Sequence, residues 1–159
     1  MKPARTDIDF MRLALRQAQK AQNLGEVPVG AILAHQGKVI ARGYNRSIAN
    51  HDAGAHAEML TLRRAGKTLR NYRLSATILY VTLEPCAMCA GAMIWSRIGK
   101  VVYGCADAKA GALGSVVNLN ELKLNHRLEV TGGVLEQDCR DLLQNFFRAR
   151  RRKSFFPNI

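Results

Sequence analysis

Two short motifs in the sequence carry residue types that bind metal ions. The first is His56-Ala57-Glu58, and the second is Pro85-Cys86-Ala87-Met88-Cys89. Each motif stands where a helix is expected to begin, and Cys86 and Cys89 are three positions apart, so both thiols face the same side of one helical turn. The positive end of that helix favours the thiolate form that binds metal. With His56 as a third ligand, the cysteines predict a tetrahedral Zn²⁺ site whose fourth position is open to water, as in a catalytic zinc centre.

A carboxylate accompanies these ligands. Glu58 lies two residues after His56, so it should reach the same pocket without binding the metal, where it can take a proton from water and return it to a substrate. The combined pattern, His-x-Glu followed by Pro-Cys-x-x-Cys, is similar to the signature of the zinc-dependent nucleobase deaminases. The sequence therefore predicts Glu58 as the catalytic residue beside one Zn²⁺ per subunit.

Three other interpretations of these motifs remain open. A closed structural zinc would need a fourth ligand, for which Cys105, Cys139 or His51 could serve. A redox-active Cys-x-x-Cys would use the two cysteines but would leave the other motif without a purpose. The histidine and glutamate could also be ordinary core and helix residues that accompany the cysteines by chance. The catalytic site is the interpretation that accounts for all four residues together.

The elements that must position these residues follow from the hydrophobic pattern. Thr6 and Asp9 are placed to form a capping pair for a first helix, and the strand-like runs 27–34 and 38–45 are joined through Gln36-Gly37 as a hairpin. The remaining expected elements are a helix over 55–66, a strand over 77–83, a helix over 85–98, strands over 101–105 and 128–134, and a final helix from 136.

This order of elements, αββαβαβ, a long loop, then β and α, predicts an α/β fold. Strands that alternate with helices are typical of a mostly parallel sheet, and the opening hairpin adds an antiparallel pair. We expect one mixed sheet of about five strands sandwiched between helices. No linker or internal repeat interrupts the chain, so residues 1–159 are predicted to form a single domain with a basic helix end and tail from about residue 148.

The charge of the chain points to a polyanionic partner. Lys and Arg number 24 against 12 Asp and Glu, a formal net charge of +12, which favours nucleic acid over a merely solvated basic surface. The segment 148–153 concentrates this charge, and the aromatics that flank it suit stacking on unpaired bases; they are Phe146, Phe147, Phe155 and Phe156. The alternative for this tail is a frayed basic helix end with two phenylalanines in the core.

The sequence offers no sign of export or of membrane insertion. The segment 1–7 has a basic start without an apolar stretch behind it, and the longest apolar run, at 90–95, is too short to span a bilayer. Four cysteines without an export signal fit a reducing compartment. We therefore expect a cytoplasmic protein with no membrane partner.

Beyond the two motifs, the wider sequence resembles the tRNA-specific adenosine deaminases along nearly its whole length. The matching stretches are 25–31, Asn45, 55–58, 79–93, 104–114, 125–127 and 146–148. The resemblance implies a cytidine-deaminase-like, three-layer fold, a zinc cofactor and a homodimer. It also implies hydrolytic conversion of the wobble adenosine in the anticodon loop of an arginine tRNA to inosine, with release of ammonia.

The same resemblance implies roles for residues outside the metal motifs. Asn45 would read the purine in the pocket, and Asp107 would contact the nucleotide before the target. Asn125 and Phe147 would belong to the surface for the anticodon loop. Asn45 could instead only cap a turn, and Asp107 could be a simple turn residue. With the phosphate contacts expected from the basic tail, the predicted substrate-binding residues are Asn45, Asp107, Asn125, Phe147, Arg148 and Arg150.

A homodimer is also indicated by the helix that begins at Cys86. Up to Trp95 this helix carries no charged side chain, so it is apolar all round. One side should hold the zinc ligands against the sheet, and the other would form an exposed apolar patch in a monomer, which a second copy would bury. Alternatively, the long loop or the final helix of the same chain covers this face.

The metal motifs do not choose the substrate, because attack at C4 of cytosine and at C6 of adenine uses the same groups. Two alternatives to tRNA editing follow. One is a deaminase of a free base or nucleoside such as cytosine, guanine or cytidine, against which the basic charge argues. The other is a non-enzymatic RNA-binding module with a structural zinc, which would bind its metal through four protein groups.

Overall fold

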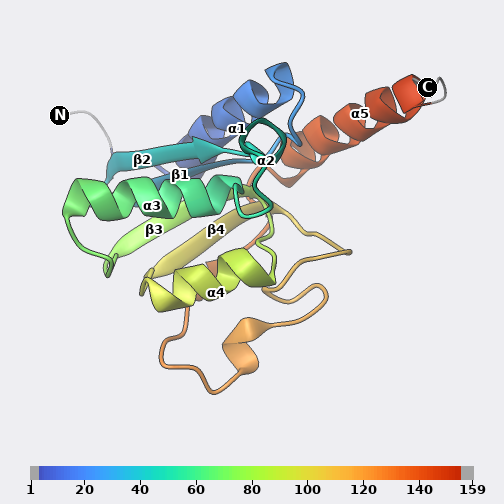
Figure 1. Ribbon diagram of the computed structural model, residues 1–159. Coiled ribbons are helices and arrows are strands. Elements are labelled where there is room, and N and C mark those ends of the chain that lie inside the picture. The colour runs from blue at the N-terminus through green and yellow to red at the C-terminus, as the bar shows by residue number, and fades with distance from the viewer. Residues whose placement is uncertain (1–3, 155–159) are drawn as a thin grey trace.

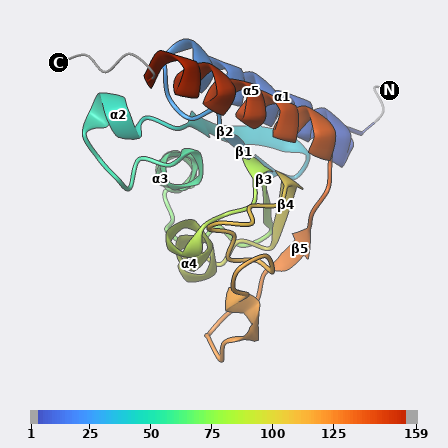
Figure 2. The same cartoon turned by 90° about the vertical axis from the view of Figure 1, so that its right-hand side faces the viewer.

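A five-stranded sheet forms the middle layer of the molecule (Figure 2). Its strands are β1 (Gly30–His35), β2 (Lys38–Tyr44), β3 (Thr77–Leu83), β4 (Lys100–Cys105) and β5 (Glu129–Thr131), in the spatial order β2-β1-β3-β4-β5. The computed structural model describes residues 4–154, so Phe155 and Phe156 of the predicted tail lie outside the described residues.

Helices cover both faces of the sheet (Figures 1 and 2). α1 (Asp7–Asn23) and α5 (Glu136–Ser154) lie on one face, and α3 (Ala57–Leu69) and α4 (Ala87–Trp95) lie on the other. Two shorter elements, α2 (Ser47–Asn50) and the 3₁₀ helix η1 (Leu119–Glu121), sit in the connections before α3 and after β4. The mixed sheet between two layers of helices confirms the predicted α/β fold class.

The direction of the strands divides the sheet into two halves. β1 runs antiparallel to both β2 and β3, whereas β4 runs parallel to both β3 and β5. The predicted antiparallel hairpin of β1 and β2 is confirmed, whereas the expectation of a mostly parallel sheet is wrong for β1 and β3, which also pair antiparallel. β2 and β3 do run in the same direction and are joined through α3, but β1 lies between them and separates the parallel pair.

The predicted start of α1 is confirmed by its hydrogen bonds. The Asp9 backbone N–H donates to Oγ1 of Thr6 (3.3 Å), and the Thr6 N–H donates to the Asp9 carboxylate (3.0 Å), which together form a capping box. The helix then packs directly on β1, since a Cβ atom at Gly30 would lie 2.1 Å from the Ala14 carbonyl oxygen. This contact anchors the first layer to the centre of the sheet.

Several element boundaries differ from those predicted. β1 begins at Gly30 rather than at residue 27, because Pro28 has no N–H to donate to a strand ladder. α3 passes through Gly66 and ends at Leu69, where Arg70 takes the left-handed conformation (φ 51°) that would normally favour glycine. α4 ends at Trp95, before the predicted residue 98, and β5 is limited to 129–131. α2 is too short to show a hydrophobic period and was not predicted.

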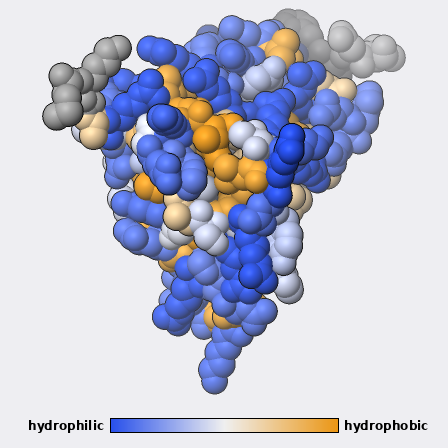
Figure 3. All heavy atoms as spheres, turned by 90° about the vertical axis from the view of Figure 1, so that its left-hand side faces the viewer, coloured by the Kyte–Doolittle hydropathy of each residue, from blue (hydrophilic) through white to orange (hydrophobic). Residues whose placement is uncertain are grey.

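The core fills both sides of the central strands, under α1 on one face and under α3 and α4 on the other. Its largest fully buried side chains include Met11, Ile32, Leu33, Leu79, Tyr80 and Val101. The hydroxyl of Tyr80 donates to Asp7 Oδ1 (2.7 Å), so this buried ring keeps a polar partner. Hydrophilic side chains cover most of the face in Figure 3, with an apolar area near its middle. Within residues 4–154, no helix combines the length and hydrophobicity needed to cross a bilayer.

Candidate metal centre and substrate pocket

The first turns of α3 and α4 bring the predicted metal ligands together. His56 is the residue directly before α3, Cys86 is the residue directly before α4, and Cys89 lies in the first turn of α4. The Nδ1 atom of His56 is 3.7 Å from Cys86 Sγ and 3.5 Å from Cys89 Sγ, and the three ligand atoms all lie within 4.8 Å of one another. One nitrogen and two sulfurs form a donor set that zinc prefers, so these residues fit the metal.

The residues considered as a fourth ligand do not join this set. The buried Cys105 thiol donates to the Thr82 carbonyl (3.5 Å), and Cys139 packs from α5 against β4, where a Cβ atom at Gly104 would lie 2.3 Å from its sulfur. His51 is exposed at the end of α2. Within residues 4–154, the cluster therefore has three protein ligands, as an open metal site requires.

The four cysteines differ in their electrostatic surroundings. Hydrogen bonds from Cys89 and His56 lower the pKa of the Cys86 thiol, and the N-terminus of α4 also favours its thiolate. Burial raises the pKa of Cys105 to about 11 and that of Cys139 to about 12. The pKa of Cys89 is also raised, because its thiol is hydrogen-bonded to Cys86 and is buried. Cys86 is thus the cluster thiol that is prepared as a thiolate, and Cys105 and Cys139 remain protonated core residues.

Glu58 is buried beside the metal ligands. It lies in the first turn of α3 with only 4% of its surface exposed, and its Oε2 atom has no hydrogen-bond partner among the described residues. Burial raises the pKa of this carboxyl to about 7. Buried carboxylate oxygens are rarely left without a partner, so the orphaned oxygen indicates a group that is not protein, such as a water or a substrate.

A pocket of about 970 Å³ opens above this cluster. It lies at the carboxyl ends of β3 and β4 and is closed by the segment after β4 and by α5. His56, Glu58 and Cys86 line it. Of the residues predicted to bind substrate, those that also line it are Asn45, Asp107, Phe147, Arg148 and Arg150. Asn125 does not, because it lies after η1, where its carbonyl accepts a hydrogen bond from Arg97 Nη1 (2.8 Å).

Asn45 lies both at the pocket and at the start of α3. Its side chain lines the pocket at the end of β2, and its Oδ1 atom accepts a hydrogen bond from the Ala57 backbone N–H (2.8 Å) at the start of α3. The residue therefore caps the helix that carries Glu58. Because the side-chain oxygen is oriented toward α3 by this bond, the amide N–H groups of Asn45 can donate to a ligand in the pocket.

The two adjacent phenylalanines of α5 point in different directions, as a helix requires. Phe147 is 41% exposed and lines the pocket, while Phe146 is partly buried and carries the Arg150 guanidinium over its ring at 5.3 Å. Phe147 is therefore the ring that a base can reach. The two rings still touch edge to face, with centroids 5.4 Å apart.

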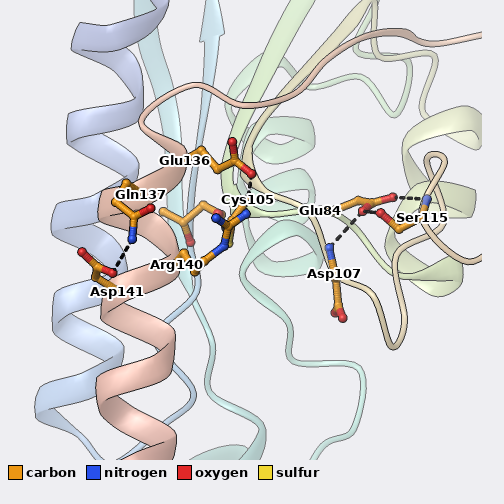
Figure 4. Close-up of polar contacts among 9 residues, drawn as sticks. Glu84, Cys105, Asp107, Ser115, Glu136, Gln137, Arg140 and Asp141 are labelled. Atoms are coloured by element: carbon orange, nitrogen blue, oxygen red, sulfur yellow. Dashed lines mark hydrogen bonds and ion pairs between the residues drawn. The ribbon is translucent and has the colours of Figure 1, made fainter.

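Sequence reasoning missed two buried carboxylates and an arginine at the pocket. Glu26 accepts backbone hydrogen bonds from Ile48 (3.2 Å) and Ala49 (2.8 Å) and so fixes α2. Glu84 accepts hydrogen bonds from the segment after β4, and Arg140 forms an ion pair with Glu136 on α5 (Figure 4). For Glu84 the available signal was its place directly after the apolar strand β3, since an acidic side chain needs several donors to be buried there.

Comparisons with known proteins agree with this geometry. A family model for the cytidine and deoxycytidylate deaminase zinc-binding region matches residues 4–105. The chain is 50% identical over 147 residues to a tRNA-specific adenosine deaminase of Haemophilus influenzae, covering 91% of this chain and 85% of that protein. It is 48% identical over 145 residues to a tRNA-specific adenosine deaminase of Bacillus subtilis, covering 91% and 90%.

Solved structures share the fold. One, from a study of A-to-I editing by tRNA:A34 deaminases at the wobble position of transfer RNA, is 42% identical with a TM-score of 0.83, over 84% of this chain and 98% of that chain. A guanine deaminase from Nitrosomonas europaea is 25% identical with a TM-score of 0.76, over 92% and 86%. Because a guanine deaminase has the same fold, the fold alone does not distinguish deaminases of free bases from those of tRNA. The distinction rests on the sequence relatives that are 50% and 48% identical. The chain belongs to the tRNA-specific adenosine deaminases, within the cytidine and deoxycytidylate deaminase family.

Proposed function

We propose that this protein converts the wobble adenosine of a tRNA anticodon loop to inosine and releases ammonia. The observation that carries the proposal is the buried Glu58 carboxyl, whose unpartnered oxygen lies beside the three metal ligands in a pocket with arginines at its rim. A proton-transfer group, a metal-binding set and a surface for a polyanion thus meet in one place. The names of the sequence relatives support the same activity.

We assign one zinc ion per subunit to His56, Cys86 and Cys89. When bound, zinc lowers the pKa of a water in its open position and so supplies a nucleophile at neutral pH. The two helices that begin at these residues stabilise the thiolates through their positive ends. The neutral imidazole of His56 contributes the nitrogen ligand.

Glu58 moves the protons of the reaction. A pKa of about 7 lets this carboxyl accept and release a proton near neutral pH with little free-energy penalty. It takes a proton from the attacking water and delivers it to N1 of adenine while C6 is attacked. It then takes the proton of the new C6 hydroxyl and passes it to the amine, so that the C6 carbonyl forms as the C6–N bond breaks and ammonia leaves. Its burial keeps these transfers inside the pocket.

The remaining predicted residues are assigned to the RNA around the target. The base must leave its stack before C6 can be reached. Asn45 reads the purine through its amide N–H groups, Asp107 contacts the nucleotide before the target, and Phe147 stacks on an unpaired base. Asn125 is outside the pocket of its own chain, so its assignment requires RNA that extends past the pocket or a second copy of the protein.

The rim of the pocket favours a polynucleotide over a free base. Arg140, Arg148 and Arg150 line it together with Lys109. A free purine or nucleoside offers no phosphate to these cations, whereas an anticodon loop places several phosphates around the target base. The pocket volume of about 970 Å³ is also at the upper end of the range for small-molecule sites.

The test is an assay of zinc-loaded protein on an anticodon stem-loop of arginine tRNA, on the same stem-loop with cytidine at the wobble position, and on free bases. We expect inosine and an equal amount of ammonia from the arginine stem-loop alone. Ammonia from free guanine or cytosine at a comparable rate would support the free-base alternative. Tight RNA binding without any product would support the non-enzymatic alternative.

We also propose that the protein is a homodimer joined through the outer face of α4. Met88 (40% exposed) and Trp95 (74% exposed) lie on that face, with Gly91 and Ala92 between them at helical spacing. α5 lies on the opposite side of the sheet (Figure 2), and the segment around η1 leaves Met88 and Trp95 exposed, so neither covers them. A second copy would bury this apolar surface.

Light scattering at micromolar concentration tests the dimer. We expect about twice the chain mass of 17.6 kDa for the unmodified protein and the monomer mass for Trp95→Glu. Leu24→Glu is the matched control, because Leu24 is 58% exposed but lies after α1 on another surface. A mass near 17.6 kDa for the unmodified, active protein would refute the proposal.

A further inference from the structure

Glu84 stands at the junction of β3 and the metal motif. It directly follows β3, and its backbone N–H donates to the Cys105 carbonyl (2.9 Å) at the end of β4. Only 1% of its surface is exposed. Its side chain points away from the strands into the segment 107–115, which we call the Asp107 loop (Figure 4).

Both oxygens of the Glu84 carboxylate are occupied by this loop. Oε2 accepts hydrogen bonds from the Asp107 backbone N–H (3.0 Å) and the Ser115 hydroxyl. Oε1 accepts hydrogen bonds from the backbone N–H groups of Leu113 (3.1 Å) and Ser115 (3.1 Å). One carboxylate therefore binds both ends of the loop, and four donors compensate for its burial without a cation.

The loop is shaped to close over this carboxylate. A Cβ atom at Gly111 would lie 2.4 Å from both Cδ and Oε2 of Glu84, so glycine is what allows the backbone to approach. The Ala112 N–H also donates to the Pro85 carbonyl (2.8 Å), next to the metal motif. The loop is thus held both by the Glu84 carboxylate and by the backbone of the residue that follows it.

The consequence of this anchoring reaches the pocket. The Asp107 side chain points away from Glu84 (Figure 4), and residues 107–109 line the pocket. Within the loop, Asp107 Oδ1 accepts hydrogen bonds from the backbone N–H groups of Lys109 (2.9 Å) and Ala110 (3.2 Å). The backbone of Asp107 is held by Glu84, and its carboxylate is held by the next turn.

We propose that Glu84 is a positioning residue for substrate recognition, which fixes the Asp107 loop at the pocket wall that meets the nucleotide beside the target base. This inference rests on the proposed function. The carboxylate oxygens of Glu84 are used by the loop, so it acts on the RNA through Asp107 and not by contact. Loss of the anchor should loosen RNA recognition while the zinc cluster and the proton transfer persist.

The experiment compares Glu84→Gln, Gly111→Ala and Ser115→Ala. Glutamine has the size of glutamate, but it turns an N–H₂ group toward backbone N–H donors and so cannot accept all of their hydrogen bonds. The Cβ atom of alanine at position 111 would collide with the Glu84 carboxylate from the side of the loop. Ser115→Ala removes one of the four donors. We expect KM for the anticodon stem-loop to rise about tenfold in the first two variants, the effect of losing one hydrogen bond to a charged group. The rise should be smaller in the third, with kcat and zinc content unchanged in all.

Amide hydrogen exchange supplies a readout that does not depend on activity. Exchange over 107–115 should quicken in Glu84→Gln, while exchange over 57–65 and 87–94 stays as in the unmodified protein. Unchanged exchange and KM in both strong variants would overturn the proposal, and so would a fall in kcat with loss of zinc. If the unmodified protein does not deaminate the stem-loop, the proposed function fails, whereas the exchange result still decides whether Glu84 anchors the loop.

Discussion

The floor and the rim of the pocket are built in different ways. The floor consists of His56, Glu58, Cys86 and Cys89, which belong to the first turns of two helices that rest on the core; Glu58 is 4% exposed and Cys89 is fully buried. The rim consists of residues 106–109 together with Phe147, Arg148, Arg150 and Arg151, and nearly all of its side chains are exposed. The chemistry is therefore placed by core packing, whereas recognition depends on exposed side chains carried by a loop and by the end of α5.

The two parts of the rim are held unequally. The Asp107 loop is tied to the sheet through Glu84, a buried carboxylate. The end of α5 projects beyond the sheet (Figure 1), and the Arg150 guanidinium rests on the Phe146 ring of its own helix. We expect substitutions in the floor to abolish chemistry, and substitutions in the rim to change RNA affinity in smaller steps.

The largest effect is expected at a metal ligand. Cys86→Ala removes one of three ligands, so the protein should lose its zinc and all measurable deamination. Cys105→Ala is the matched control, because that thiol is buried outside the cluster and should leave the zinc content unchanged. Metal analysis of the two purified variants measures the difference. Equal zinc loss in both would show that the cluster extends to the core cysteine.

The next effect concerns proton transfer. Glu58→Gln keeps the shape of the side chain but removes its ability to carry a proton, so the rate should fall by at least about 10²-fold. Zinc content and RNA affinity should stay constant, because Glu58 is outside the ligand set. Single-turnover kinetics with metal analysis measures both. A variant that loses its metal would show that Glu58 is a ligand or a structural support.

The difference between floor and rim also explains what could be predicted from the sequence. The ligands follow from local spacing, since Cys86 and Cys89 share one helical turn and each motif begins a helix. The capping pair at Thr6 follows from the same local logic. Such features depend on residues that are close along the chain, so they can be predicted from a single sequence.

The features that escaped prediction depend on distant partners. The donors to Glu84 lie 23 to 31 residues away, in a loop that has no hydrophobic period. The antiparallel pairing of β1 with β3 joins strands more than 40 residues apart along the chain, and the spacing of residues does not reveal that β1 lies between β2 and β3. Helix ends failed for a related reason, since Gly66 is tolerated inside α3 and Arg70 takes the terminating conformation instead.

A moderate effect is expected at the aromatic part of the rim. Phe147→Ala should weaken binding of the anticodon stem-loop by about tenfold, the factor produced by losing one base stacked on an aromatic ring. The folding stability should change little, because this ring is 41% exposed. Phe146→Ala is the control, because that ring is partly buried. This substitution should lower the melting temperature more than Phe147→Ala does, and it should weaken RNA binding less. If Phe146→Ala weakened RNA binding more than Phe147→Ala, the base would stack on Phe146 instead.

The smallest effect is expected at the basic end of α5. Arg148 lines the pocket and is exposed, so a phosphate contact at this residue acts mainly through the release of counterions. Arg148→Gln should reduce the slope of log Kd against log salt concentration by about 0.7, the value for one phosphate of a single strand. Turnover at saturating RNA should not change, because the floor is untouched.

Lys20→Gln is the matched control for this measurement. Lys20 is exposed in the last turn of α1 and is not among the residues that line the pocket, and its substitution removes the same charge. If general attraction by the net charge of +12 governed binding, both variants would flatten the slope equally. A change in Arg148→Gln alone would place a phosphate at the rim. Equal slopes in both variants and the unmodified protein would show that the end of α5 contributes no phosphate contact at that position.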